Sequence, residues 1–373
     1  MADDTVTRPP AESGRRLSLR SLARPGRALA ARAAGLAGRT SDAARSLPGA
    51  VRAIPGTLLP LRGRGGDDSE SITGFVHGHR VAAGARVARA AVAVTIDGDE
   101  VRVLQHFGSR VVGWGSFPVD ASQLEGGDVL DAGGLGETLD DLFDRGGFSR
   151  RHVVGGISGR HARSGLLDVP RAEGQGGLEA VVAEEAGRQL GYVLGESYLF
   201  WQRAARQRHG RAVFAVVIPQ EPLLLLLEAL DGAHVQPDSL DLKPLALARA
   251  VNQRDAIVAS LESDCLDVVV VADDLPTVIR SAAVPPGMLA QAAREYLVGE
   301  VARALATSRG SRAPLDGEAK IYLAGSRADE ALAEQLRLQT GHEIGRLAPP
   351  AYYPLDFPVA EQLANVGLAL KRE

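Results

Sequence analysis

The side chains best suited to catalysis are few in this sequence, and their spacing matches no common catalytic motif. A P-loop needs glycine directly before its lysine, but Lys243, Lys320 and Lys371 follow Leu, Ala and Leu. No G-x-G-x-x-G motif follows an expected strand, and Ser158 lacks the spacing of a serine nucleophile turn. The eight histidines are scattered, so we expect no metal site from them. The sequence therefore does not favour P-loop, hydrolase or metal chemistry.

Cys265 is the only cysteine in the chain. A single cysteine excludes an internal disulfide and favours a reducing compartment, the cytoplasm. Its neighbours Asp264 and Asp267 are acidic, so no positive charge in the local sequence makes its thiolate available. We therefore expect a buried, inert cysteine, and we expect Trp114 and Trp201 to be packing anchors.

The elements that must position any site form a repeated pattern. Residues 89–119 and 254–284 each predict a three-stranded antiparallel meander, and the second copy begins 165 residues after the first. Apolar and β-branched runs alternate with turn formers, Asp97-Gly98-Asp99 in the first copy and Glu262-Ser263-Asp264 in the second. Helical and strand patterns follow each meander. The repeat therefore predicts an α/β protein with two similar lobes.

Composition and glycine content divide the chain further. We expect a disordered, arginine-rich tail over residues 1–75, a first lobe over 76–253 and a second lobe over 254–373. The glycine-rich stretch of about 108–210 predicts a small subdomain inserted in the first lobe. In the second lobe, Ser326 is expected to cap a helix over 327–339. The longest apolar runs fall short of the roughly 20 residues that cross a bilayer.

The tail differs in charge from the rest of the chain. Residues 1–66 hold twelve arginines against four acidic residues, although the whole chain has a formal net charge of −4. Scattered prolines and this charge predict a solvated, disordered leader, with contact to an anionic membrane surface as the alternative. No apolar core follows the arginine pair at 15–16, so export is not expected. Without interleaved aromatic residues, we expect no specific nucleic-acid binding.

The order of the elements resembles the actin-like ATPase superfamily and, more narrowly, the type IV pilus assembly protein PilM family. The order and spacing of five segments carry the resemblance, residues 92–103, 215–248, 256–284, 320–335 and 365–371. It implies an actin-like (RNase H-like) fold with two lobes, each built from a duplicated β-meander plus helices. The arginine-rich tail lies outside the resemblance.

The resemblance also implies where a nucleotide would bind. In the first hairpin of the family, a carboxylate helps to hold a hydrated metal ion and a glycine lets backbone N–H groups approach phosphate oxygens. Aligning residues 101–102 with the family's Val-Lys pair places Thr95 at the carboxylate position and Asp97 at the glycine position. A carboxylate beside a phosphate is electrostatically unfavourable. Gly98 could serve only through a shifted turn, and an ordinary hairpin turn is the simpler interpretation.

The second hairpin departs further from the family pattern. Ala259, Leu261 and Cys265 stand where the family has Asp, Gly and Thr, and the paired glycines beneath the nucleoside survive only as Gly325 followed by serine. We therefore expect weak or absent nucleotide affinity and no bound cofactor. The candidate residues of this degenerate nucleotide cleft are Thr95, Asp97, Gly98, Glu262, Ser263, Gly325 and Ser326.

The function implied by the resemblance is that of a cytoplasmic scaffold or adaptor, a pseudo-ATPase at the inner face of the cell membrane. Its machine would be a type IV pilus or a related secretion system. Its partners would be the N-terminal peptide of a bitopic inner-membrane pilus protein, bound by main-chain pairing, and the pilus motor ATPase. The alternative is an active actin-like ATPase or small-molecule kinase that uses ATP and Mg²⁺. Phosphoryl transfer demands a carboxylate and glycine-backed loops, and Thr95, Ala259 and Leu261 argue against both.

Overall fold

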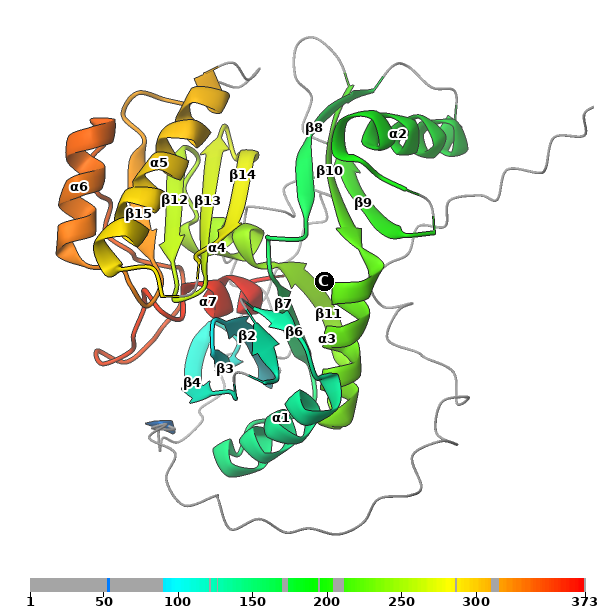
Figure 1. Cartoon of the computed structure of the whole chain (residues 1–373), viewed down its shortest axis with the longest axis vertical. Helices are drawn as coiled ribbons and strands as arrows, with labels where there is room; N and C mark the ends of the chain where they lie inside the picture. Colours follow the sequence, from blue (N-terminus) through cyan, green and yellow to red (C-terminus); the bar gives the residue numbers. More distant parts are fainter. Residues whose placement is uncertain are drawn as a thin grey trace, which may run out of the picture.

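The computed structural model describes residues 52–53, 90–120, 122–125, 127–169, 174–193, 195–203, 211–285, 287–309 and 315–371. These residues form two α/β lobes and a smaller subdomain beside them (Figure 1). Among the described residues, no helix is long and apolar enough to span a membrane.

The first lobe is built on a six-stranded sheet with the order β1-β4-β3-β2-β7-β11. An antiparallel meander supplies three of its strands, β2 (Ala90–Asp97), β3 (Glu100–Phe107) and β4 (Arg110–Pro118). β7 (Val153–Ile157) and β11 (Pro237–Leu242) continue the sheet in parallel, and β1 (Arg52–Ala53) pairs with the edge of β4. The outer face packs against α1 (Ala132–Gly146) and α3 (Gln220–Gly232).

The second lobe repeats this plan on a four-stranded sheet with the order β14-β13-β12-β15. Its meander consists of β12 (Ala256–Leu261), β13 (Cys265–Ala272) and β14 (Leu275–Ala283), and β15 (Lys320–Ala324) pairs with β12 in parallel. Both faces of β12 and β13 are buried, which explains their nearly continuous apolar sequence. The outer face packs against α5 (Ala290–Arg309) and α6 (Glu330–Thr340).

The two meanders match in detail, as the sequence repeat predicts. In the first meander the pairing of β3 with β4 shifts register between Gln105 and His106, and in the second the pairing of β13 with β14 shifts between Val270 and Val271. The two positions are equivalent in the repeat, because Gln105 and Val270 are 165 residues apart, as are His106 and Val271. A bulge adds twist at the same point of each meander. This agreement confirms the expected actin-like architecture of two similar lobes.

The inserted subdomain is smaller than the sequence suggests. It consists of a three-stranded antiparallel sheet covered by one helix, built from β8 (Arg163–Val169), α2 (Gly174–Leu190), β9 (Ser197–Arg203) and β10 (Arg211–Pro219). The expected insertion of about 108–210 is therefore too long at its start, because α1 and β7 pack into the first lobe. Glycines in 108–160 do not prevent regular structure there. A short hairpin, β5 (Leu124–Glu125) with β6 (Asp128–Val129), precedes α1.

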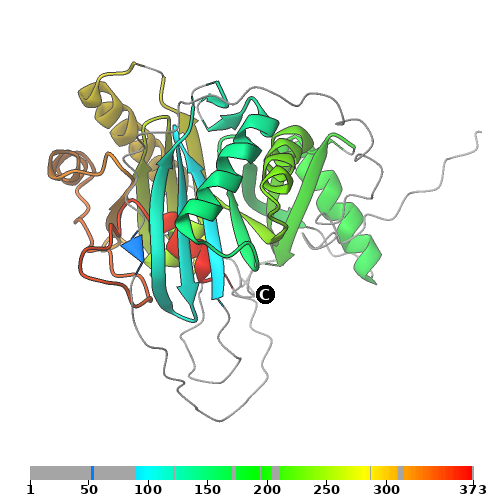
Figure 2. The same cartoon turned by 90° about the horizontal axis from the view of Figure 1, so that it is seen from below.

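Two helices lie between the sheets of the two lobes. α4 (Lys243–Val251) and α7 (Leu363–Ala369) pack against each other, α4 on the second sheet and α7 on the first (Figures 1 and 2). A methyl group on Gly367 would lie 1.8 Å from the carbonyl oxygen of Ala246, so only glycine permits this close approach. Each helix thus crosses from one lobe to the sheet of the other, and the two chain crossings lie between the two sheets.

Trp114 packs as the sequence suggests. Its ring meets that of Phe357 edge to face with centroids 5.3 Å apart, and the residue is 6% exposed. Trp201 packs between the inserted sheet and α2.

Candidate functional site

The turns of the two repeated hairpins meet at the cleft between the lobes. Gly98 has a φ of +69°, and a methyl group there would lie 2.0 Å from the Ser263 hydroxyl oxygen. The hairpin tips are therefore in direct contact. This contact brings Asp97 from the first turn and Glu262 from the second to the same buried region, where they are 3% and 2% exposed.

Arg102 connects the two lobes from its position on β3. Its guanidinium donates from Nη1 and Nη2 to the two carboxylate oxygens of Glu262, each at 2.9 Å. The same Nη1 is 3.1 Å from the carbonyl oxygen of Glu361 and 3.4 Å from Asp97 Oδ2. Glu262 also accepts bonds from the backbone N–H and the hydroxyl of Ser326, at 3.0 and 2.7 Å. Because this bidentate pair is fully buried, it fixes the geometry of the contact.

Lys243, the first residue of α4, forms the second half of the contact. Its ammonium donates to Asp97 Oδ1, and its Nζ lies 3.5 Å from Asp267 Oδ2 on β13. Asp97 also accepts a 2.8 Å bond from the Thr95 hydroxyl, and Asp267 accepts one from Ser281. Lys243 therefore bridges carboxylates of both lobes. We call Asp97, Arg102, Lys243, Glu262 and Asp267 the interlobe network.

The charges in the interlobe network follow from burial and partners. Burial raises the pKa of Asp97, but Lys243 and Arg102 outweigh it, so the pKa lies below its ordinary value. Burial lowers the pKa of Lys243, but Asp97 and the other acidic neighbours raise it well above its ordinary value. The pKa of Asp267 is raised, because burial exceeds the opposing effects of Lys243 and Ser281. Asp97 and Lys243 are thus a charged pair, and Asp267 is the carboxylate that takes a proton more readily.

Cys265 lies closer to a positive charge than the sequence indicates. Lys243 Nζ is 3.6 Å from its sulfur, so the expectation of no positive neighbour is wrong. The lysine comes from a distant segment and could not be seen in the local sequence. Burial nevertheless raises the pKa of the Cys265 thiol well above its ordinary value, ahead of the opposing effect of Lys243. The thiol is buried, as expected.

The glycine turn after β15 packs against protein backbone. Gly325 has a φ of +97°, and a methyl group there would lie 2.3 Å from the carbonyl oxygen of Leu261. Ser326 does not cap the following helix, which begins at Glu330 with Asp329 as its N-cap. The expected cap is therefore wrong, because the Ser326 hydroxyl is used by Glu262.

All seven residues expected in the degenerate nucleotide cleft therefore lie around this interlobe contact. Their role toward a nucleotide stays a prediction. Sequence reasoning missed the partners Arg102, Lys243 and Asp267 as members of the site. The repeat held one signal, because its spacing makes Asp97 equivalent to Glu262 and Arg102 equivalent to Asp267.

The donor set does not fit a magnesium ion and a triphosphate. Asp97 is held by an ammonium and a hydroxyl, whereas Mg²⁺ needs carboxylates that are free to accept hydrated metal. Gly98 faces Ser263 instead of an open space where N–H groups could bind phosphate. Within the described residues, no group of three or more His, Cys, Asp or Glu side chains is arranged to hold a metal ion.

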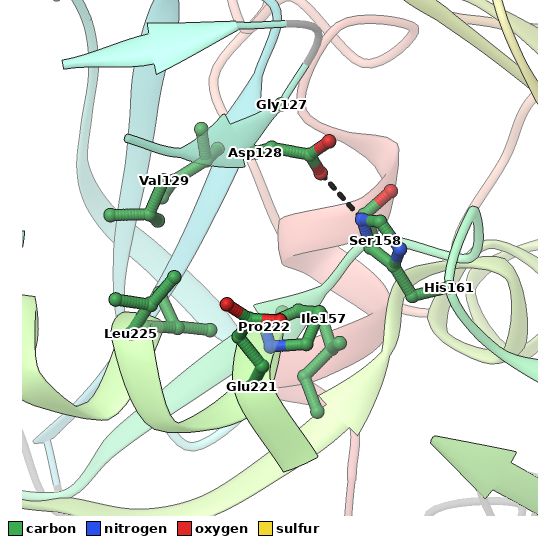
Figure 3. A pocket seen from close by; sticks show the side chains of 12 residues that line it. Gly127, Asp128, Val129, Ile157, Ser158, His161, Glu221, Pro222 and Leu225 are labelled. Carbon is green, nitrogen blue, oxygen red and sulfur yellow. Dashed lines mark hydrogen bonds and ion pairs between the residues drawn. The ribbon is translucent and has the colours of Figure 1, made fainter. Parts of the chain in front are cut away.

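A separate cavity of about 210 Å³ lies in the first lobe between β6, the end of β7 and α3 (Figure 3). Asp128 accepts bonds from His161 at 2.5 Å and from Arg160 at 3.0 Å at one side of it. The N-terminal turn of α3 contributes Glu221 and Leu225 on the other side. The lining is mostly apolar and comprises Ile96, Gly127, Asp128, Val129, Gly156, Ile157, Ser158, His161, Glu221, Pro222, Leu225 and Leu226.

The duplicated meanders, the two crossing helices and the hairpin turns that meet between the lobes define an actin-like ATPase fold. A solved PilM–PilN type IV pilus biogenesis complex superposes with a TM-score of 0.60 at 20% identity, covering 75% of this chain and 97% of that chain. The cytoplasmic domain of EpsL, an inner-membrane component of the Vibrio cholerae type II secretion system, gives a TM-score of 0.47 at 12% identity over 76% of this chain and 96% of its own. The ethanolamine utilization protein EutJ from Carboxydothermus hydrogenoformans gives 0.45 at 12% identity over 76% and 90%.

No protein-family model matches this sequence. No curated protein matches it either. The structural likeness therefore describes the fold of the chain, and function must be argued from its own residues.

Proposed function

We propose that this protein is a PilM-like scaffold or adaptor of a type IV pilus or related secretion machine, with little or no ATP hydrolysis. The structural likeness to the PilM–PilN complex supports the choice of machine. The observation that best supports little or no ATP hydrolysis is the interlobe network, in which Arg102 of the first lobe pairs with Glu262 of the second. Phosphoryl transfer would require this space for phosphates and metal.

The partner in this proposal is an extended peptide from the cytoplasmic N-terminus of a bitopic inner-membrane protein. The cavity in Figure 3 suits one apolar side chain of such a peptide, because Ile157, Leu225 and Leu226 contribute to its lining. Asp128 is already paired with Arg160 and His161, but the Glu221 carboxylate also borders the cavity, so a basic peptide residue near Glu221 would add attraction. Main-chain pairing would supply the rest of the affinity without any catalytic residue.

A peptide-binding assay tests the proposed partner. The probe is the cytoplasmic N-terminal peptide of the single-span membrane protein encoded beside this gene, followed by fluorescence anisotropy. The Leu225→Asp variant should weaken binding about tenfold or more, because it places a charge in the cavity. The matched control is Leu224→Asp on the same helix, since Leu224 is 48% exposed and does not line the cavity. Equal affinities of the two variants, with equal melting temperatures, would reject this cavity as the peptide site.

The alternative function, an active actin-like ATPase or small-molecule kinase, makes a different prediction. It requires micromolar binding of ATP with Mg²⁺, lost in the Asp97→Ala variant. Isothermal titration calorimetry measures this directly. Such binding would overturn the scaffold proposal, whereas its absence leaves peptide binding as the activity to test.

We also propose a peripheral position at the inner face of the cell membrane, together with contact to the pilus motor ATPase. The positive charge of the arginine-rich tail supports attraction to anionic lipid. Apart from Arg52–Ala53, residues 1–75 lie outside the part of the chain that the structure describes.

A further inference from the structure

We propose that the interlobe network is a built-in lock that holds the two lobes in one closed arrangement without nucleotide. The proposal goes beyond the scaffold function and does not depend on the partner. Arg102 on the first lobe and Glu262 on the second make the direct contact, and Lys243 completes the lock beside them.

The contact between the lobes follows the symmetry of the repeat. The repeat makes Arg102 equivalent to Asp267 and Asp97 equivalent to Glu262. The repeat therefore relates two contacts between the lobes. One is between Arg102 and Glu262, and the other is between Asp267 and Asp97. The first is a direct ion pair, but the second joins two carboxylates, which repel each other.

Lys243 resolves the repulsion in the second contact. Its ammonium donates to Asp97 and lies 3.5 Å from Asp267, so it supplies the cation that the repeat lacks at that position. Lys243 is the first residue of α4, directly after the strand β11 where the chain crosses between the lobes. The second contact is thus tied to the segment about which the lobes would turn.

The energetics of burial favour a geometric role for the interlobe network. Taking five charged side chains out of water is costly, and buried ion pairs often add less to stability than apolar residues of the same size. Such pairs can supply a defined geometry, because the bonds from Arg102 and Lys243 form together only when the two hairpins are held in this arrangement. Glu262 accepts four bonds, two from Arg102 and two from Ser326, and all four depend on the closed arrangement or support the carboxylate within it.

The position of the interlobe network also suits a lock. In two-lobed folds the lobes open by hinge motion about the chain crossings, and a ligand between them commonly favours the closed state. Here α4 and α7 form the crossings, and the interlobe network lies above them, where Gly98 also meets Ser263. In this protein the Arg102 guanidinium and the Lys243 ammonium hold the lobes together, as a bound ligand would in such a fold. We therefore infer one closed state.

The test measures the distance between the lobes in the full-length protein. Spin labels are placed on Glu137→Cys in α1 and Leu338→Cys in α6, both exposed, and pulsed electron paramagnetic resonance gives the distance distribution. Native Cys265 is buried and should not take a label. The parent should give one narrow distribution that does not change with millimolar ATP and Mg²⁺.

Arg102→Met and Glu262→Gln should each raise the fraction at longer distance, on the order of tenfold relative to the parent. The matched control is Glu300→Gln, because Glu300 is also buried and paired with arginines, but only within the second lobe. It should keep the parent distribution even if its melting temperature falls.

Two results would overturn the lock. One is a parent protein that already shows two populations or shifts with ATP and Mg²⁺, and this result needs no variant to fold. The other is a set of folded Arg102 and Glu262 variants that remain as narrow as Glu300→Gln. If either variant fails to fold, the milder Ser326→Ala, which removes the 2.7 Å bond to Glu262, takes its place and should raise the longer-distance fraction to a smaller degree.

Discussion

Replacing Lys243 with methionine tests the electrostatics of the buried contact. The Lys243 side chain is 4% exposed, and methionine preserves most of its length while removing the ammonium. In this variant the carboxylates of Asp97 and Asp267 both face the methionine side chain. Asp97 keeps the Thr95 hydroxyl and the more distant Arg102, whereas Asp267 keeps the Ser281 hydroxyl as its hydrogen-bond partner.

The expected cost follows from these remaining partners. Removing one member of a buried ion pair typically costs about 3–5 kcal/mol. Because Asp97 retains two partners, we expect a loss of about 3 kcal/mol in the free energy of unfolding at pH 7. The loss should shrink at lower pH, because Asp267 already has a raised pKa and would take a proton in the folded variant before the unfolded chain does. The recovery grows as the pH falls through the raised pKa of Asp267, so the loss should be smaller at pH 5 than at pH 7.

The Asp97–Lys243 pair of the parent protein depends on pH in the opposite way. The pKa of Asp97 lies below its ordinary value, so this group stabilises the fold above the ordinary carboxyl pKa and loses that effect as the pH falls through its folded pKa. The pKa of Lys243 lies well above its ordinary value, so its contribution is complete below the ordinary lysine pKa and is lost only at strongly alkaline pH. The pair therefore supports stability throughout neutral pH.

Urea unfolding at pH 7 and pH 5, followed by tryptophan fluorescence, measures both effects. The matched control is Lys371→Met, since Lys371 pairs with Asp241 at 3.7 Å but is 25% exposed, and Asp241 keeps Arg249 at 2.8 Å. We expect the control to lose about 1 kcal/mol or less. A Lys243→Met loss below about 1 kcal/mol at pH 7, or an equal loss at both pH values with unchanged urea slopes, would refute the reasoning.

Three further predictions concern helix packing, helix capping and the tail. Gly367→Ala should lower the free energy of unfolding by about 3 kcal/mol or more, because its methyl group would meet the Ala246 carbonyl. Gly299→Ala, whose methyl group would have no neighbouring atom nearer than 3.6 Å, should raise it by about 0.5–1 kcal/mol. Thermal unfolding of the two variants compares these effects. Asp329→Ala should cost about 1 kcal/mol through loss of its bond to the Leu332 N–H, and an unchanged melting temperature would contradict the cap. Deleting the arginine-rich tail should abolish sedimentation with anionic liposomes at low salt; identical sedimentation of both proteins across a salt series would exclude lipid attraction by the tail.

Much of the fold could be predicted from the sequence, because its strands are apolar and its turns are marked by Gly, Asp and Ser. The meanders over 89–119 and 254–284 correspond to β2–β4 and β12–β14. Local periodicity and turn chemistry determine such elements, so one sequence is enough to find them.

The predictions that were wrong depend on contacts between segments that are distant in the sequence. The extent of the inserted subdomain depends on which sheet α1 and β7 join, and glycine content does not report this. Ser326 follows a glycine turn and precedes a helix, as a cap would, but Glu262 attracts its hydroxyl. The charged neighbour of Cys265 comes from Lys243, which no local pattern connects to it.

The sequence by itself determined the duplication, the strands and the altered turns, because each of these depends on residues close together in the chain. Only the tertiary structure decided what the altered turns do. Arg102 and Glu262 are 160 residues apart, and their pairing depends on how the lobes pack on α4 and α7. A buried charge must find its partner wherever the fold places one, since leaving it alone in an apolar interior is too costly. For this reason the two lobes are joined by charged side chains such as Arg102 and Glu262. In the sequence, the repeat was the only sign of their pairing.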